Sequence, residues 1–396
     1  MTSLLLLLAA PFVFDLGPKG HPSTNLDGGF DEAPVPHWAR RLPGVPIAAF
    51  THTERSRPST DGTSLFLGSA SSNELIQLSR GDGELVQVYA AGAPVQAEAV
   101  VQDGRVYFAD TGGYTWCYEV GSTEPLWSHF GGAPIGSKPT LSEGRLYVSS
   151  VDDVLYALDT DDGGLLWRYA RPADAARDSE LTLFGAPAPL IAGRLVLAGF
   201  SDGAVVALDA VDGEVNWERR VGEGRYPDVI ATLVLDDGDV FAGGYSEPLV
   251  SFDVGTRNVR WRLDVGSAEP PLLAGDVLFH GATDGKLRRI DRATGTVVWT
   301  WDSGTTGALT QPQETGAGLL VASSDGSLYL VDADLGTLNW SYDPGATLTG
   351  ITSAPLVMGR QVVAVTNAGR VISMLAPGKI ATVDQPLIGN ERLPNR

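Results

Sequence analysis

The sequence predicts an all-β protein made of repeated four-stranded units, and two observations lead to this prediction. The first is a recurring phrase, clearest as ALDTDDGGLLW at residues 157–167, in which Asp, Gly and Trp keep a fixed spacing. From Gln87, which replaces the Trp of the first copy, to Trp340 the copies are 40, 40, 50, 44, 38 and 41 residues apart. A period of about 40 residues is typical of radial repeat folds.

The second observation is the pattern inside each unit. Short runs rich in aliphatic and aromatic residues, such as Leu146–Val148 and Leu155–Leu158, are bounded by Gly and Asp, as β-strands are. No run in the repeats keeps a helical period of apolar residues over the length of a helix. Four short antiparallel strands in each radial repeat form the blade of a β-propeller.

The phrase has a structural interpretation. The Asp at the end of the third strand can accept hydrogen bonds from the turn that follows, and the Gly supplies the positive φ that such turns often need. The Trp then lies in the outermost strand, where a large ring can fill the gap between neighbouring blades. We expect these structural docking residues to be Trp38, Trp127, Trp167, Trp217, Trp261, Trp299 and Trp340.

The ends of the repeat region predict how the ring closes. The seventh copy of the phrase ends in Trp340, and Gln361–Thr366 and Arg370–Leu375 resemble second and third strands with no Trp after them. The missing outer strand is at the other end of the chain, because the segment after Trp38 resembles the one after Trp217. The prediction is an eight-bladed β-propeller whose last blade is closed by the N-terminal strand around Trp38, which leaves no free ring ends.

Three segments follow from this count. Residues 35–378 form the propeller, and residues 379–396 a tail. Residues 1–34 combine a signal-like segment, with the run Leu4–Leu8, and a linker rich in Gly and Pro. An apolar run of this length is too short to span a bilayer, so we expect an exported protein.

Composition and motifs give no catalytic constellation. A formal charge of −20 argues against a nucleic-acid partner, which needs a basic face. The lone Cys117 can form no internal disulfide, and the histidines are scattered. Residues 159–163 resemble a calcium loop but fail the EF-hand spacing. We therefore expect no catalytic residue, no cofactor and no metal site.

The repeated phrase resembles the motif of propellers related to pyrroloquinoline-quinone dehydrogenases, over roughly residues 35–378. The resemblance implies the fold more strongly than the activity, because the motif is a packing device. Eight-bladed quinoprotein dehydrogenases set two adjacent cysteines against the quinone and hold calcium nearby. A chain with one cysteine lacks that form of the cofactor site.

A narrower resemblance is to the BamB family of outer-membrane assembly factors. It rests on Leu181–Pro189, on the strand text that follows, and on Gly224–Ile230. In that family two such loops dock the propeller onto the periplasmic domains of the barrel-assembly protein. The resemblance implies that the partner-binding residues are Leu181, Leu183, Phe184, Arg225 and Asp228.

This sequence departs from the family's pattern at three points. Phe184 replaces a typical Arg, Ile230 replaces the second Asp, and the lipid-anchoring Cys after the signal is missing. The departures favour a more apolar contact and membrane association only through a partner. The longest interval, from Trp167 to Trp217, places about ten extra residues in blade four, where extra length often marks a binding face.

The sequence thus predicts a non-catalytic, BamB-like scaffold that binds another protein and assists outer-membrane β-barrel assembly, in the periplasm or at the periplasmic face of the outer membrane. Three alternatives remain open. The chain could be a ligand-binding or sensor propeller, or a quinone-dependent dehydrogenase without the usual adjacent cysteines. Leu181 and Leu183 could also belong to a packed strand and touch no partner.

Overall fold

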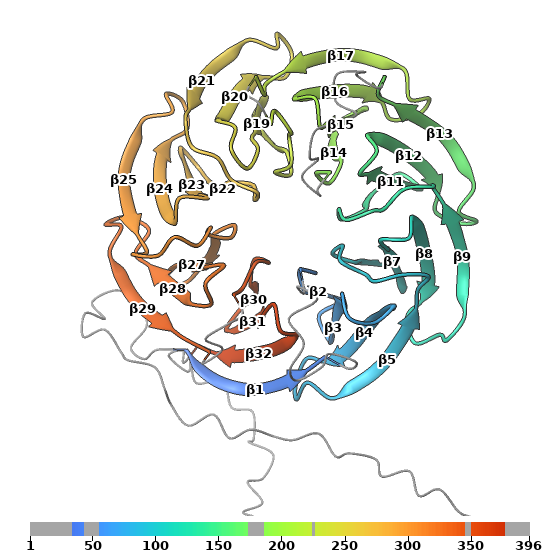
Figure 1. Cartoon of the computed structure of the whole chain (residues 1–396), viewed down its shortest axis with the longest axis horizontal. Helices are drawn as coiled ribbons and strands as arrows, with labels where there is room; N and C mark the ends of the chain where they lie inside the picture. Colours follow the sequence, from blue (N-terminus) through green and yellow to red (C-terminus); the bar gives the residue numbers. More distant parts are fainter. Residues whose placement is uncertain (1–33, 43–54, 173–185, 224–225, 345–349, 377–396) are drawn as a thin grey trace, which may run out of the picture.

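Eight sheets arranged around one axis make up the molecule (Figure 1). The structure is a computed structural model that describes residues 34–42, 55–172, 186–223, 226–344 and 350–376. Each sheet has four antiparallel strands, and the strand order within each blade runs outward from the axis. The predicted all-β, eight-bladed propeller is confirmed.

Blades 1 to 4 follow one another along the chain. Blade 1 holds β2 (Ser59–Thr60), β3 (Ser64–Gly68), β4 (Glu74–Ser79) and β5 (Leu85–Ala90). Blade 2 holds β6 (Val100–Gln102), β7 (Arg105–Ala109), β8 (Tyr114–Glu119) and β9 (Pro125–Phe130). Blade 3 holds β10 (Thr140–Ser142), β11 (Arg145–Ser150), β12 (Val154–Asp159) and β13 (Leu165–Ala170). Blade 4 holds β14 (Leu190–Ala192), β15 (Leu195–Gly199), β16 (Ala204–Asp209) and β17 (Val215–Arg220).

Blades 5 to 8 complete the ring. Blade 5 holds β18 (Val234–Asp236), β19 (Asp239–Ala242), β20 (Leu249–Asp253) and β21 (Val259–Leu263). Blade 6 holds β22 (Leu272–Ala274), β23 (Val277–Gly281), β24 (Lys286–Asp291) and β25 (Val297–Asp302). Blade 7 holds β26 (Gln313–Thr315), β27 (Gly318–Ala322), β28 (Leu328–Val331) and β29 (Leu338–Tyr342). Blade 8 holds β30 (Leu356–Met358), β31 (Gln361–Val365), β32 (Arg370–Leu375) and β1 (Val35–Arg41).

The last blade joins the two ends of the propeller in one sheet. Strand β1 pairs antiparallel with β32, and Trp38 lies opposite Ser373. Figure 1 shows the blue β1 as the outer strand beside the red β32. The predicted closure by the N-terminal strand around Trp38 is therefore confirmed.

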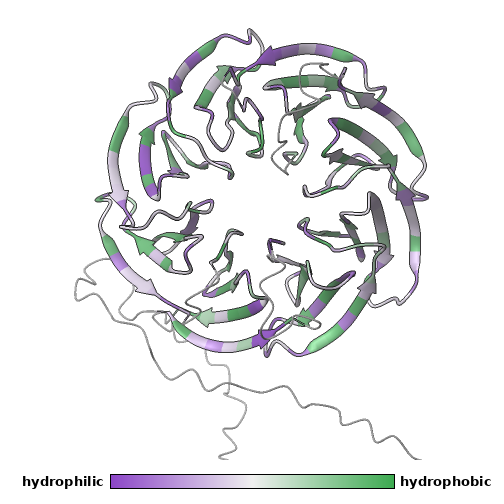
Figure 2. Cartoon of the chain, viewed as in Figure 1, coloured by the Kyte–Doolittle hydropathy of each residue, from purple (hydrophilic) through white to green (hydrophobic). Residues whose placement is uncertain are grey.

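The outer strand of each blade with a complete phrase carries a bulge just before its Trp. In blade 3, Ala157 pairs with Trp167 while Leu158 pairs with Leu165, so Leu166 is the extra residue. The same register shift recurs in the other blades that carry the phrase. A bulge bends and twists the strand locally, and it leaves Leu165 and Leu166 both pointing to solvent while Trp167 points inward. The mixed colouring of the outer strands in Figure 2 reflects this pattern.

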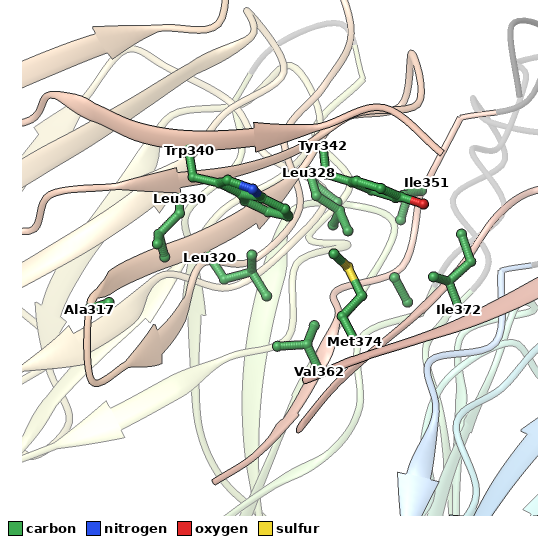
Figure 3. Close-up of a cluster of buried hydrophobic side chains, with 12 residues drawn as sticks. Ala317, Leu320, Leu328, Leu330, Trp340, Tyr342, Ile351, Val362, Ile372 and Met374 are labelled. Atoms are coloured by element: carbon green, nitrogen blue, oxygen red, sulfur yellow. The ribbon is translucent and has the colours of Figure 1, made fainter. Parts of the chain in front are cut away.

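The hydrophobic core lies between neighbouring blades rather than within one layer. Between blades 7 and 8, Trp340 stacks on Tyr342 with ring centroids 5.9 Å apart, and Met374 packs in the same cluster (Figure 3). Such clusters of buried side chains occur at successive blade junctions of the described residues. Each blade therefore depends on both neighbours for its buried surface.

Candidate functional site

The tryptophan of the phrase contacts the glycine of the next blade. A Cβ atom added to Gly163 would lie 2.5 Å from the ring of Trp127, so only Gly allows the ring to pack there. The glycine also has a φ of 72°, which L-residues rarely adopt. The same contact joins Trp38 to Gly83, Trp167 to Gly213, Trp261 to Gly295 and Trp299 to Gly336.

A hydrogen bond accompanies each of these contacts. The Nε1 of Trp127 donates to the carbonyl oxygen of Thr160 at 3.0 Å, on the turn of the next blade. The corresponding donors and acceptors are Trp38 to Arg80, Trp167 to Ala210, Trp261 to Arg292 and Trp299 to Ala333. The polar atom of the buried indole is thus satisfied by the neighbouring blade.

The aspartate of the phrase organises the turn itself. The Oδ1 of Asp291 accepts hydrogen bonds from the backbone N–H and the hydroxyl of Thr294, at 2.8 and 2.7 Å. These bonds favour the ionised carboxylate and lower the pKa of Asp291. All three residue types of the phrase therefore have structural partners.

The sequence-predicted partner-binding residues are only partly described. Leu181, Leu183, Phe184 and Arg225 lie outside the described residues. Asp228 is described, and its side chain is buried with only 4% of its surface exposed. Its part in partner binding remains a prediction.

The structure does locate the long interval. Strand β13 ends at Ala170 and β14 begins at Leu190, so the extra residues belong to the connection that enters blade 4. The connection from β17 to β18 leaves the same blade. Both follow an outer strand, and since every outer strand runs in the same sense around the ring, both emerge on the same face.

An arginine holds the start of the β13–β14 connection. Arg171 donates to Asp202 at 2.6 Å and to Glu218 at 2.7 Å, and its guanidinium lies 5.5 Å from the ring centroid of Phe200. The arginine side chain is only 10% exposed. Its contact lowers the pKa of Glu218, because Arg171 stabilises the charged form. The connection is therefore fixed to blade 4 at its origin.

A second arginine holds the start of the β17–β18 connection. Arg262, from β21 of blade 5, donates to Glu223 at 3.0 Å and to the carbonyl oxygen of Val221 at 3.3 Å. The backbone N–H of Glu223 donates to the carboxylate of Glu247 at 3.0 Å. Both connections that flank blade 4 are thus tied to neighbouring blades where they begin.

A polar cluster near the ring axis escaped the sequence prediction. Arg57, which precedes β2, donates to Gln311 and Gln313 of blade 7 at 2.9 Å each, across the inner side of blade 8. Glu98 accepts a 2.5 Å bond from Lys138 and lies 3.9 Å from Arg57. Arg57, Glu98 and Lys138 each precede the innermost strand of a blade, and this shared position was the only sequence feature that could have predicted the cluster. The residues come together only because the ring closes.

Glu269 adds a second carboxylate to this cluster. Desolvation raises the pKa of Glu269 to about 7, and the charge of Glu98 raises it further while Arg57 lowers it. A carboxylate with this pKa changes charge near neutral pH.

The described residues offer little for redox or metal chemistry. Cys117 is fully buried between blades in β8, and burial raises the pKa of its thiol to about 11, which disfavours the reactive thiolate. Among the described ranges, no group of three or more His, Cys, Asp or Glu side chains could hold a metal ion. The paired-cysteine form of a quinone site does not fit this chain. Within the same ranges no helix is long and apolar enough to cross a bilayer.

The fold and the repeated phrase define the chain as a PQQ-like repeat β-propeller. Residues 86–301 match the family model described as outer membrane protein assembly factor BamB, and the chain belongs to this family.

Curated relatives support the assignment over part of their length. The chain is 28% identical over 127 residues to BamB of Kangiella koreensis, covering 30% of this chain and 33% of that protein. It is 27% identical over 148 residues to BamB of Pseudomonas aeruginosa, covering 36% and 39%. The match thus spans about a third to two fifths of the length of these relatives.

Solved structures with the same fold include proteins of two kinds. BamB from Moraxella catarrhalis superimposes with a TM-score of 0.73 at 20% identity, over 87% of this chain and 100% of that one. A quinohemoprotein alcohol dehydrogenase from Comamonas testosteroni gives a TM-score of 0.68 at 12% identity, over 91% and 79%. At these identities the likeness shows a shared fold alone.

Proposed function

We propose that this chain is a non-catalytic, exported scaffold that binds a protein partner and assists the assembly of outer-membrane β-barrels. The proposed place of action is the periplasm or the periplasmic face of the outer membrane. The proposed partner is the outer-membrane barrel-assembly protein. Support comes from membership of the family and from the names of its curated relatives.

The observation that carries the proposal is the pair of anchored connections at blade 4. Arg171 and Arg262 fix the starts of two connections that emerge on one face. The proposed contact residues Leu181, Leu183, Phe184, Arg225 and Asp228 belong to these connections. A fixed origin lowers the conformational entropy lost when a loop binds, which favours a docking surface there.

A pull-down with the purified barrel-assembly protein tests the proposal. The variant Leu181→Asp/Leu183→Asp places two charges in the proposed apolar contact, and we expect recovery to fall at least about tenfold, as for an interface hot spot. Leu126→Asp is the matched control, because Leu126 is 49% exposed on the outer strand of blade 2. Equal recovery by both variants and the wild type would remove the docking surface from the proposal.

The quinone-dependent alternative has a direct test of its own. Pyrroloquinoline quinone and calcium are added to the purified chain, and the absorbance spectrum is recorded. We expect no stoichiometric spectral shift, since the paired cysteines are missing. A saturable shift at one equivalent of quinone would favour the quinone-dependent dehydrogenase hypothesis.

A further inference from the structure

The junction between blades 4 and 5 differs from its counterparts. Six tryptophans of the phrase are followed by a described turn in the next blade, and five of them contact a glycine and donate to a carbonyl there. Trp217 does neither within the described residues. Its ring is 8% exposed and contacts Phe252 instead, with centroids 6.1 Å apart.

The cause is one substitution in the facing turn. Arg257 occupies the position four residues after Asp253, where the turns that face the other five tryptophans have Gly, and it keeps their backbone geometry with a φ of 63°. Its N–H donates to the carbonyl oxygen of Asp253 at 2.7 Å, as Gly295 does to Asp291 at 2.9 Å.

The arginine keeps the indole at a distance. At the five glycine junctions a Cβ would approach the ring to between 2.5 and 2.7 Å. Arg257 has that Cβ, so Trp217 cannot take the close position. Gly255 does not replace the contact, since a Cβ there would meet only Asp253 within 4 Å.

A pocket of about 370 Å³, open to solvent, lies beside Trp217 and Arg257 at this junction. This volume falls within the range of small-molecule sites. Its lining residues are Ala192, Leu195, Asn216, Trp217, Leu235, Gly238, Val254, Gly255 and Arg257. Most of these are aliphatic or aromatic, and the exposed Asn216 and Arg257 stand at its edge.

The polar groups of the cavity point to one class of ligand. The Nε1 of Trp217 has no acceptor, and the guanidinium of Arg257 forms no ion pair, within the described residues. Two carboxylates of the same blade, Asp239 and Asp253, pair with Arg260 instead. The cavity therefore combines apolar walls with an unused N–H donor and an unused cation.

We propose that this junction binds a small organic carboxylate with an apolar body. The carboxylate pairs with the guanidinium of Arg257 and accepts from the indole N–H of Trp217, both charge-assisted bonds. The apolar body covers Leu195, Leu235 and Val254. Arg257 is a non-glycine residue with a positive φ. Such backbone strain costs about 1–3 kcal/mol and clusters at functional sites, so it is consistent with a binding role for this residue.

The probe for the test is octanoate, titrated into the full chain by isothermal calorimetry, with octylamine as the charge-reversed control. We expect saturable binding of octanoate and none of octylamine. Absence of octanoate binding, or equal binding of both compounds, would overturn the proposal.

Two variants test the role of Arg257 itself. Arg257→Gly removes the cation and the Cβ, suits the backbone conformation, and should close the junction and weaken octanoate binding at least about tenfold. Arg257→Lys keeps the charge and should bind within a few-fold of the wild type. Unchanged octanoate affinity in Arg257→Gly would refute the site, while circular dichroism confirms that the variant is folded.

Discussion

At the scale of single residues, the phrase works because a large ring and the smallest residue meet across a blade junction. The Trp fills the gap, and the missing Cβ of the Gly lets it approach within contact distance. The Gly has a second task, since its positive φ shapes the turn. The two tasks can be separated experimentally, because other glycines have only one of them.

We expect Gly163→Ala to destabilise the fold more than Gly104→Ala. Both glycines have a positive φ, 72° and 73°, so both variants bear a similar backbone strain of about 1 kcal/mol. Only at Gly163 does the new Cβ collide with the Trp127 ring, which adds about 1–3 kcal/mol of overpacking. Urea unfolding of the two variants gives the difference. Equal losses would show that the ring contact tolerates a methyl group.

Glu269 gives a pH dependence of defined sign. Its pKa is about 7 in the folded protein and lies near 4.5 for an ordinary glutamate, so ionisation above pH 7 opposes folding. We expect Glu269→Gln to be more stable than the wild type at pH 8, and the advantage to disappear as the pH falls from 7 to 4.5. Thermal melts across this range measure it. An advantage that grows on acidification would contradict the assignment.

His280 should act in the opposite direction. Burial lowers its pKa to about 4 in the folded protein from an ordinary value of 6.5, with Arg288 also lowering it and Asp284 opposing. Its neutral form supports the fold fully above pH 6.5, and the stabilisation is lost as the pH falls toward 4. We expect His280→Gln to flatten the loss of melting temperature between pH 6.5 and 4. An unchanged slope would show that other groups cause it.

At the scale of strands and connections, the two arginine anchors decide where blade 4 presents its flanking loops. Arg171 bridges Asp202 in the β15–β16 turn and Glu218 in β17, so it joins the end of blade 3 to two parts of blade 4. Arg262 ties the exit of blade 4 to blade 5. The connections between these points can vary in sequence while their origins stay fixed.

Loss of the first anchor should be measurable without any partner. We expect Arg171→Gln to lower the free energy of unfolding by about 1.5–3 kcal/mol, because Asp202 and Glu218 lose a charged hydrogen-bond donor in a mostly buried site. Arg168→Gln is the control, since Arg168 is exposed on β13, three residues before Arg171. Guanidinium unfolding compares the two. If Arg171→Gln lowered the free energy of unfolding no more than Arg168→Gln, the Arg171 contacts would contribute no more than an ordinary surface ion pair.

At the scale of the whole molecule, the blade number and the ring closure could be predicted because most junctions leave a Trp and a Gly at fixed spacing in the sequence. The cluster of Arg57, Glu98, Lys138 and Glu269 could not, since its members come from blades that only the closed ring brings together. The cavity beside Trp217 has one sign in the sequence, which is Arg257 in the glycine position of the phrase. This sign predicts a cavity only when the position of the Trp217 ring is known.

Synthesis order follows from the pairing of β1 with β32. Strand β1 is synthesised before every other described strand, and its partner contains residues that emerge more than three hundred positions later. Until then, Trp38 has neither its sheet neighbour nor a finished blade around it. Strand β1 therefore stays without its sheet partner until β32 has been synthesised, so closure of the ring cannot precede the synthesis of the last blade.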